Sequence, residues 1–142
     1  MSAILIDGKV VHYETLGRGR PVVFLHGWLG SWRYWMGAMD ELSTHYRTYA
    51  FDFWGFGDSD KVADRYTIPH LVLQLESFLD ALGIWRCDLV GHALGGLVAM
   101  GFSLEFPARV GQMMTVSLPF TGDAIAPGLT RLNPSSVLER VF

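Results

Sequence analysis

The chain has 142 residues, of which 50% are hydrophobic and 18% are charged, and its formal net charge is −3. This composition is typical of a globular domain with a sizeable core and excludes an intrinsically disordered chain. A net negative charge without a basic run argues against nucleic acid as a partner, because phosphates require a basic face.

The lack of a signal-peptide pattern in this sequence and its single cysteine favour a cytoplasmic protein. The stretch MSAILIDGKV lacks the basic start and long apolar core of a signal peptide. No window approaches the roughly twenty apolar residues of a membrane helix, so we expect no membrane partner. Cys87 is the only cysteine, which excludes an intrachain disulfide, and we interpret it as a small core residue. We expect no cofactor.

Apolar periodicity and turn residues predict six strands and three helices. The strands are expected at 4–6, 10–14, 22–25, 46–51, 87–90 and 112–118, and the helices at 32–42, 68–82 and 94–106. Asp7-Gly8 predicts a hairpin turn, and Thr67 is placed to cap the clearest helix. On that helix we expect Leu71 and Leu75 on the apolar face and Gln74 largely on the polar face.

This order of elements predicts an α/β fold with an open, mostly parallel sheet and helices on both faces. Residues 1–118 follow the alternating pattern without an internal repeat or linker. From Pro119 the stretch TGDAIAPGLTRLNP is punctuated by glycine and proline, which indicates a different kind of segment over 119–142.

Three turns follow predicted parallel strands, at the edge where open α/β sheets bind ligands: LHGW (25–28), DFWGFGDS (52–59) and GHALGG (91–96). The last has the frame of a nucleophile elbow, G-x-S-x-G, with Ala93 in place of the serine. Gly91 and Gly95 would clear the space that so sharp a turn needs, and Gly96 would let the helix lie close to the sheet. The start of the following helix would direct its N–H groups at the same point.

Together these motifs resemble the α/β-hydrolase superfamily over about Ile4 to Leu118. The resemblance implies that Ala93 occupies the nucleophile position and that the backbone N–H groups of Trp28 and Leu94 form the oxyanion hole. It implies that the loop over 52–59 is a structural brace for the elbow rather than a reactant. Branches of the superfamily that act on haloalkanes and epoxides use an aspartate as the nucleophile.

The resemblance also bears on domain organisation. In the superfamily the acid and the histidine follow the nucleophile along the chain, so we expect both beyond residue 142. Residues 1–118 are then the N-terminal part of the core, and 119–142 are the start of an incomplete cap. The strand at 112–118 would be a bare apolar edge, which we expect to pair with the missing C-terminal part or with a second copy of the chain.

The remaining aromatic and histidine side chains divide into pocket and structural candidates. We expect Trp54 and His26 at the pocket wall, together with Trp28, with His26 mainly bracing its loop. Trp32 and Trp35 are expected in the core, and His92 as a packed structural residue. His12, His45 and His70 are expected at surface or element-end positions, without metal-ligand spacing, so no metal site is predicted.

The function implied by the resemblance is hydrolysis of a small apolar ester, amide or diketone-type C–C substrate. The chain itself should be inactive, because a methyl group cannot attack a carbonyl. Exchange of serine for alanine deletes a single oxygen, which favours an engineered substitution. A natural, non-catalytic ligand-binding relative of the hydrolases is the alternative.

Overall fold

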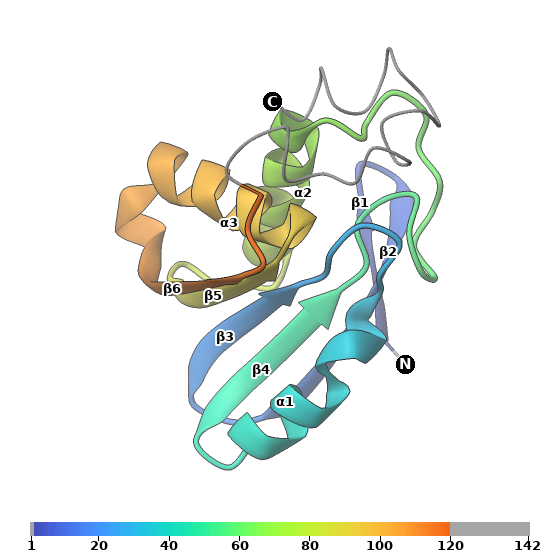
Figure 1. Cartoon of the computed structure of the whole chain (residues 1–142). Coiled ribbons are helices and arrows are strands. Elements are labelled where there is room, and N and C mark those ends of the chain that lie inside the picture. The colour runs from blue at the N-terminus through green and yellow to red at the C-terminus, as the bar shows by residue number, and fades with distance from the viewer. Residues whose placement is uncertain (1, 120–142) are drawn as a thin grey trace.

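A computed structural model describes residues 2–119 of the chain. They form a sheet with the strand order β1-β2-β4-β3-β5-β6 and helices packed against it (Figure 1). The strands are β1 (Ser2–Ile6), β2 (Lys9–Gly17), β3 (Arg20–Leu25), β4 (Tyr46–Phe51), β5 (Cys87–His92) and β6 (Val110–Val116). The helices are α1 (Met36–Leu42), α2 (Ile68–Ala81) and α3 (Leu94–Glu105), with short 3-10 turns η1 (Trp32–Trp35) and η2 (Pro107–Arg109).

The predicted α/β class is confirmed. The strand β1 and its partner β2 are antiparallel, β2 is antiparallel to β4, and β4, β3, β5 and β6 run parallel to one another. In Figure 1, α1 lies on one face of the sheet, whereas α2 and α3 lie together on the other. Because β3 lies between β4 and β5, the turn that follows it lies between the other two motif-bearing turns.

The side chains of β3 alternate between the two faces of the sheet, so this strand contributes to the core on both. Val22 and Phe24 pack in the smaller core cluster with Met39 of α1. Val23 and Leu25 belong to the larger cluster, to which α2 and α3 contribute most of their buried side chains. Successive strand residues point to opposite faces, so the continuous apolar run of β3 is buried on both sides of the sheet.

Element boundaries depart from expectation where pairing with distant residues extends them. The strand β2 continues to Gly17, because residues 13–17 pair with β4. The first predicted helix is divided into η1 and α1, and Ser31 caps η1 by accepting a hydrogen bond from the N–H of Arg33. Thr67 caps α2 as expected, since its side chain accepts from the N–H of His70.

Cys87 is a core residue, as expected. Its side chain is buried at the start of β5, and burial, with a smaller effect of Asp88, raises the pKa of the thiol to about 12. The thiol therefore stays protonated and unreactive in the folded chain at neutral pH.

Two further expectations concern the membrane and the cap. No helix within residues 2–119 combines the length and the apolar character that crossing a bilayer requires. The predicted cap segment lies, apart from Pro119, outside the described residues.

Candidate active site

The turn between β5 and α3 bends sharply at Ala93. This residue has φ 48° and ψ −110°, a conformation that L-residues rarely adopt, and its side chain makes no capping hydrogen bond to α3. Its backbone N–H donates to the carbonyl oxygen of Val116 on β6 at 2.9 Å. The predicted strand–bend–helix geometry is therefore present at the alanine, and neighbouring backbone holds the strained conformation in place.

Glycines on both sides of Ala93 make this bend possible, as the sequence indicates. A Cβ atom at Gly91 would lie 2.6 Å from the backbone nitrogen of Gly96, and one at Gly95 would lie 2.7 Å from the carbonyl oxygen of His26. Neither obstacle is a flexible side chain. Gly96 instead meets the end of the Leu118 side chain, so Gly95 is the residue that brings α3 close to the central strand.

The turn after β3 lies directly against this bend. Leu25 pairs with Gly91 in the parallel ladder, so both turns leave the sheet side by side. A Cβ atom at Gly27 would lie 2.6 Å from Nδ1 of His92, which shows how closely the two turns approach. The structure therefore brings the turn that carries Trp28 to the start of α3. Leu94 is the first residue of that helix, and its N–H has no acceptor within the helix.

His26 braces the turn after β3, as expected. Its Nδ1–H lies 2.8 Å from the carbonyl oxygen of Gly27, and its Nε2 accepts a hydrogen bond from the N–H of Phe53 at 3.0 Å. The ring is 1% exposed and packs against Phe53 and Phe56. Both ring nitrogens are thus used in joining two turns, and the additional place of His26 at a pocket wall stays a prediction.

Burial lowers the pKa of His26, although its hydrogen bond to Gly27 acts in the opposite direction. In the unfolded chain the imidazole of His26 is protonated as the pH falls through about 6.5, whereas in the folded chain it stays neutral at that pH. We therefore expect the free energy of unfolding to fall as the pH decreases through that value. One such proton changes the free energy of unfolding by at most about 1.4 kcal/mol per pH unit. Urea unfolding between pH 5 and 8 measures the slope. His26→Asn should reduce it and His45→Gln, an exposed control, should not; equal slopes in all three proteins would contradict this account.

Hydrogen bonds to Asp52 organise the turn after β4, and its expected role as a brace for the elbow stays a prediction. Its buried carboxylate accepts hydrogen bonds from the N–H of Trp32 at 2.8 Å and from the N–H of Asp58 at 2.9 Å. Ser59 donates its hydroxyl hydrogen to the carbonyl oxygen of Asp52 and accepts from the N–H of His12. These contacts tie the turn to η1 and to β2.

The prediction that Gln74 lies on the polar face of α2 is wrong. It is fully buried, its Oε1 accepts from the N–H of Trp54 at 3.0 Å, and its Nε2 donates to the carbonyl oxygen of Asp52 at 3.3 Å. Helical periodicity predicts that this polar residue points away from the core. Burial follows because the turn after β4 folds over this helix and presents unpaired backbone groups to the amide.

The tryptophans differ in their surroundings. Trp54 is 2% exposed and belongs to the large core cluster, whereas Trp28 is 39% exposed and its ring packs edge-on against Phe56. Trp32 and Trp35 pack against the smaller core cluster, which confirms their expected core role. Trp54 also lines a cavity of about 220 Å³ with Asp7, Arg65, His70, Leu73 and Ser77, which neither Ala93 nor Trp28 lines.

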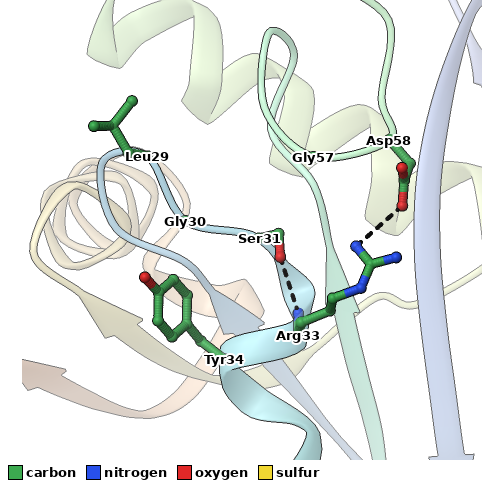
Figure 2. Close-up of a pocket in the computed structure, with 7 residues that line it drawn as sticks. All are labelled: Leu29, Gly30, Ser31, Arg33, Tyr34, Gly57 and Asp58. Carbon is green, nitrogen blue, oxygen red and sulfur yellow. Dashed lines mark hydrogen bonds and ion pairs between the residues drawn. The ribbon is translucent and has the colours of Figure 1, made fainter.

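A second, open cavity of about 450 Å³ lies between the turns after β3 and β4 (Figure 2). It is lined by Leu29, Gly30, Ser31, Arg33, Tyr34, Gly57 and Asp58. Figure 2 shows Arg33 reaching across to Asp58, and the two side chains form an ion pair of 3.2 Å. None of these residues was expected at a pocket, because the sequence indicates the two turns but not which side chains lie between them.

Two histidines differ from expectation. His92 was expected to be packed but is exposed, with its ring edge against Gly27. His12 was expected at a surface or element end but is 4% exposed, because β2 is covered by η1 and by the turn after β4. His45 is exposed, as expected.

Comparison with known proteins identifies the family. The family model described as alpha/beta hydrolase fold matches residues 20–140. The chain is 33% identical over 130 residues to 2-hydroxy-6-oxo-2,4-heptadienoate hydrolase of Pseudomonas putida, covering 89% of the chain and 47% of that protein. It is 32% identical over 117 residues to epoxide hydrolase 4 of Mus musculus, covering 80% of the chain and 33% of that protein.

Among solved structures, Est816, described as an N-acyl homoserine lactone degrading enzyme, matches with a TM-score of 0.83 and 30% identity, covering 93% of this chain and 52% of that one. The chain thus spans about half the length, or less, of the relatives it matches. The matching proteins named here are hydrolases whose names refer to different types of substrate. The chain belongs to the alpha/beta hydrolase fold family.

Proposed function

We propose that this chain is the N-terminal part of a serine-hydrolase-type enzyme in which Ala93 occupies the position of the nucleophile. The observation that carries the proposal is the backbone conformation at Ala93, φ 48° and ψ −110°, held between two glycines that no other residue can replace without collision. A strained residue at a sharp bend between strand and helix is the arrangement by which a nucleophile elbow exposes its central side chain.

The backbone N–H groups of Trp28 and Leu94 are proposed to bind the oxyanion that forms when a carbonyl is attacked. The support is positional: the two residues follow adjacent, paired strands, and Leu94 begins α3, whose N-terminal dipole favours negative charge. The acid and the histidine are proposed to lie in polypeptide beyond residue 142, since the matching proteins are about twice as long or longer.

The proposed substrate is a small apolar ester, amide or diketone-type C–C compound. The half-exposed Trp28, packed on Phe56 beside the bend, supports an apolar recognition surface. Among the relatives, the hydrolase from Pseudomonas putida is named for a hydroxy-oxo-dienoate, and Est816 is described as degrading a lactone. Both names describe a substrate that contains a carbonyl group, whereas epoxide hydrolase 4 of Mus musculus is named for a substrate that does not.

The chain as it stands is proposed to be inactive, because the methyl group of Ala93 cannot form a covalent intermediate. An engineered exchange of serine accounts for an elbow that is complete except for one oxygen.

The same observation suits a second candidate, a natural binding protein that keeps the pocket without chemistry. Assay of Ala93→Ser in the full-length protein against nitrophenyl esters separates the two. Restored turnover supports the enzyme, whereas ligand binding without turnover supports the binding protein.

The outer edge of β6 is proposed to be covered by further polypeptide, either the remainder of the full-length protein or a second copy of the chain. Within the described residues β6 pairs with β5 alone, and Met113, Met114 and Val116 are 41%, 57% and 41% exposed. An apolar strand with free backbone groups along one side is a template for pairing with another strand.

The isolated 142-residue chain is therefore expected to self-associate. Light scattering during size-exclusion chromatography measures its mass, and Met114→Lys should shift the population toward monomer, because a charge on an edge strand opposes pairing. Lys9→Arg on β2 is the matched control and should leave the mass unchanged. A monomeric, cooperatively unfolding parent chain would contradict the proposal.

A further inference from the structure

Three side chains that the fold brings together from different parts of the sequence can act as metal ligands. A ring nitrogen of His12 and one carboxylate oxygen each of Asp52 and Asp58 lie within 4.8 Å of one another. His12 lies on β2 and Asp52 directly after β4, and the N–H of Asp52 donates to the carbonyl oxygen of His12 across this antiparallel pair. Asp58 comes from the far end of the turn that Asp52 begins.

The buried histidine of this cluster is incompletely satisfied. His12 is 4% exposed, and its Nε2 has no hydrogen-bond partner in the described part of the chain. That nitrogen lies 3.4 Å from a carboxylate oxygen of Glu14, close enough for electrostatic attraction but not in hydrogen-bonding geometry. A buried polar nitrogen without a hydrogen bond costs free energy, which a bound cation would recover.

The local charge also favours a cation. The carboxylates of Asp52 and Asp58 lie beside His12, and Asp58 forms an ion pair of 3.2 Å with the guanidinium of Arg33. Arg33 and Asp58 are both about half exposed, and the guanidinium of Arg33 also lies 5.1 Å from the centroid of the Trp32 ring. Gly57 leaves room beside the carboxylate of Asp52, because a Cβ atom there would meet that group.

We propose that His12, Asp52 and Asp58 form a binding site for a divalent metal ion, with Zn²⁺ as the ion best suited to one imidazole and two carboxylates. Ligand atoms around a tetrahedral Zn²⁺ lie about 3.3 Å apart, given bonds of about 2.0–2.2 Å. The three groups therefore approach one another by on the order of 1 Å on binding. Asp58, the exposed member, provides this movement when it leaves Arg33.

The bound ion would have a structural effect that is independent of the proposed hydrolase chemistry. It would join β2 to both ends of the turn over 52–59, which braces His26 through the N–H of Phe53. Binding to the folded chain raises its melting temperature, since the unfolded chain does not hold these ligands together. Sequence spacing gave no indication of this site, because the ligands come from positions 40 and 46 residues apart.

The test uses the full 142-residue chain, freed of metal with a chelator and titrated with ZnCl₂ in competition with a zinc-sensitive dye. We expect one Zn²⁺ per chain and a rise in the melting temperature. Asp58→Asn, an exposed substitution that leaves the core intact, should weaken binding at least about tenfold, and so should His12→Gln. Asp64→Asn and His45→Gln are matched controls outside the cluster and should bind as the parent does.

Arg33→Gln is expected to change the affinity for Zn²⁺ in the opposite direction. It removes the cation that competes for Asp58, so Zn²⁺ should bind severalfold more tightly. Equal affinity in the parent and in Asp58→Asn would assign the binding to other groups and overturn the proposal. The absence of stoichiometric binding by the parent, or unchanged affinity in Arg33→Gln, would overturn it as well.

Discussion

Ala93→Ser in the full-length protein is expected to raise the rate of nitrophenyl ester hydrolysis by about 10⁶-fold, the factor by which loss of the serine of such a triad lowers turnover. The physical reason is that the substitution adds a nucleophilic oxygen at a bend that is already formed. Neither the backbone of Ala93 nor the approach of Gly27 to His92 needs to change. Initial rates of nitrophenolate release measure the effect.

Ala93→Gly is the matched control for this result. It relieves the strain of φ 48° without supplying a hydroxyl, so it should raise the free energy of unfolding by about 1 kcal/mol and leave the protein inactive. Ala93→Asp, assayed with epoxides, separates a carboxylate-type lineage from a serine type. Turnover in the unaltered protein, or in Ala93→Gly, would show that residue 93 does not occupy the nucleophile position.

Gly95→Ala is expected to lower the free energy of unfolding by about 3 kcal/mol, near the upper end of the usual cost of overpacking. The added Cβ atom would lie 2.6 Å from the carbonyl carbon of Leu25 and 2.7 Å from the carbonyl oxygen of His26. Both atoms belong to the backbone at the end of the central strand β3, which is hydrogen-bonded on both sides and cannot withdraw. Helix α3 must therefore move away from the sheet.

The matched control is Gly37→Ala on α1, where a Cβ atom would meet no atom within 4 Å. Alanine there should raise the free energy of unfolding by about 0.5–1 kcal/mol, because it is the better helix former. Urea denaturation at constant pH compares the three proteins. If Gly95→Ala were as stable as the parent, the close packing of α3 on β3 would be wrong.

The local sequence pattern predicted most of the elements, because periodicity and capping depend on neighbouring residues. The strand at 46–51 agrees with β4, and Thr67 caps α2 as expected. The bend at Ala93 was predicted in part for the same reason, since Gly91 makes room for Gly95 and Gly96 of the same turn, whereas Gly95 makes room for the distant backbone of Leu25 and His26.

The wrong expectations concern residues whose surroundings come from distant parts of the chain. Gln74 and His12 are polar residues on otherwise regular elements, and a polar residue without a partner in the local sequence is interpreted as exposed. Both are buried because the turn after β4 crosses them and supplies or requires hydrogen bonds.

The amino-acid sequence by itself determined the α/β class, the order of the elements and the bend at which Ala93 stands. Only the tertiary structure decided that β3 lies between β4 and β5, so that the turns bearing Trp28 and Leu94 adjoin, and that His12 meets Asp52 and Asp58. The physical reason is that hydrophobic periodicity specifies which face of an element is buried but not which element buries it. Strand pairing and side-chain packing over the whole chain make that choice.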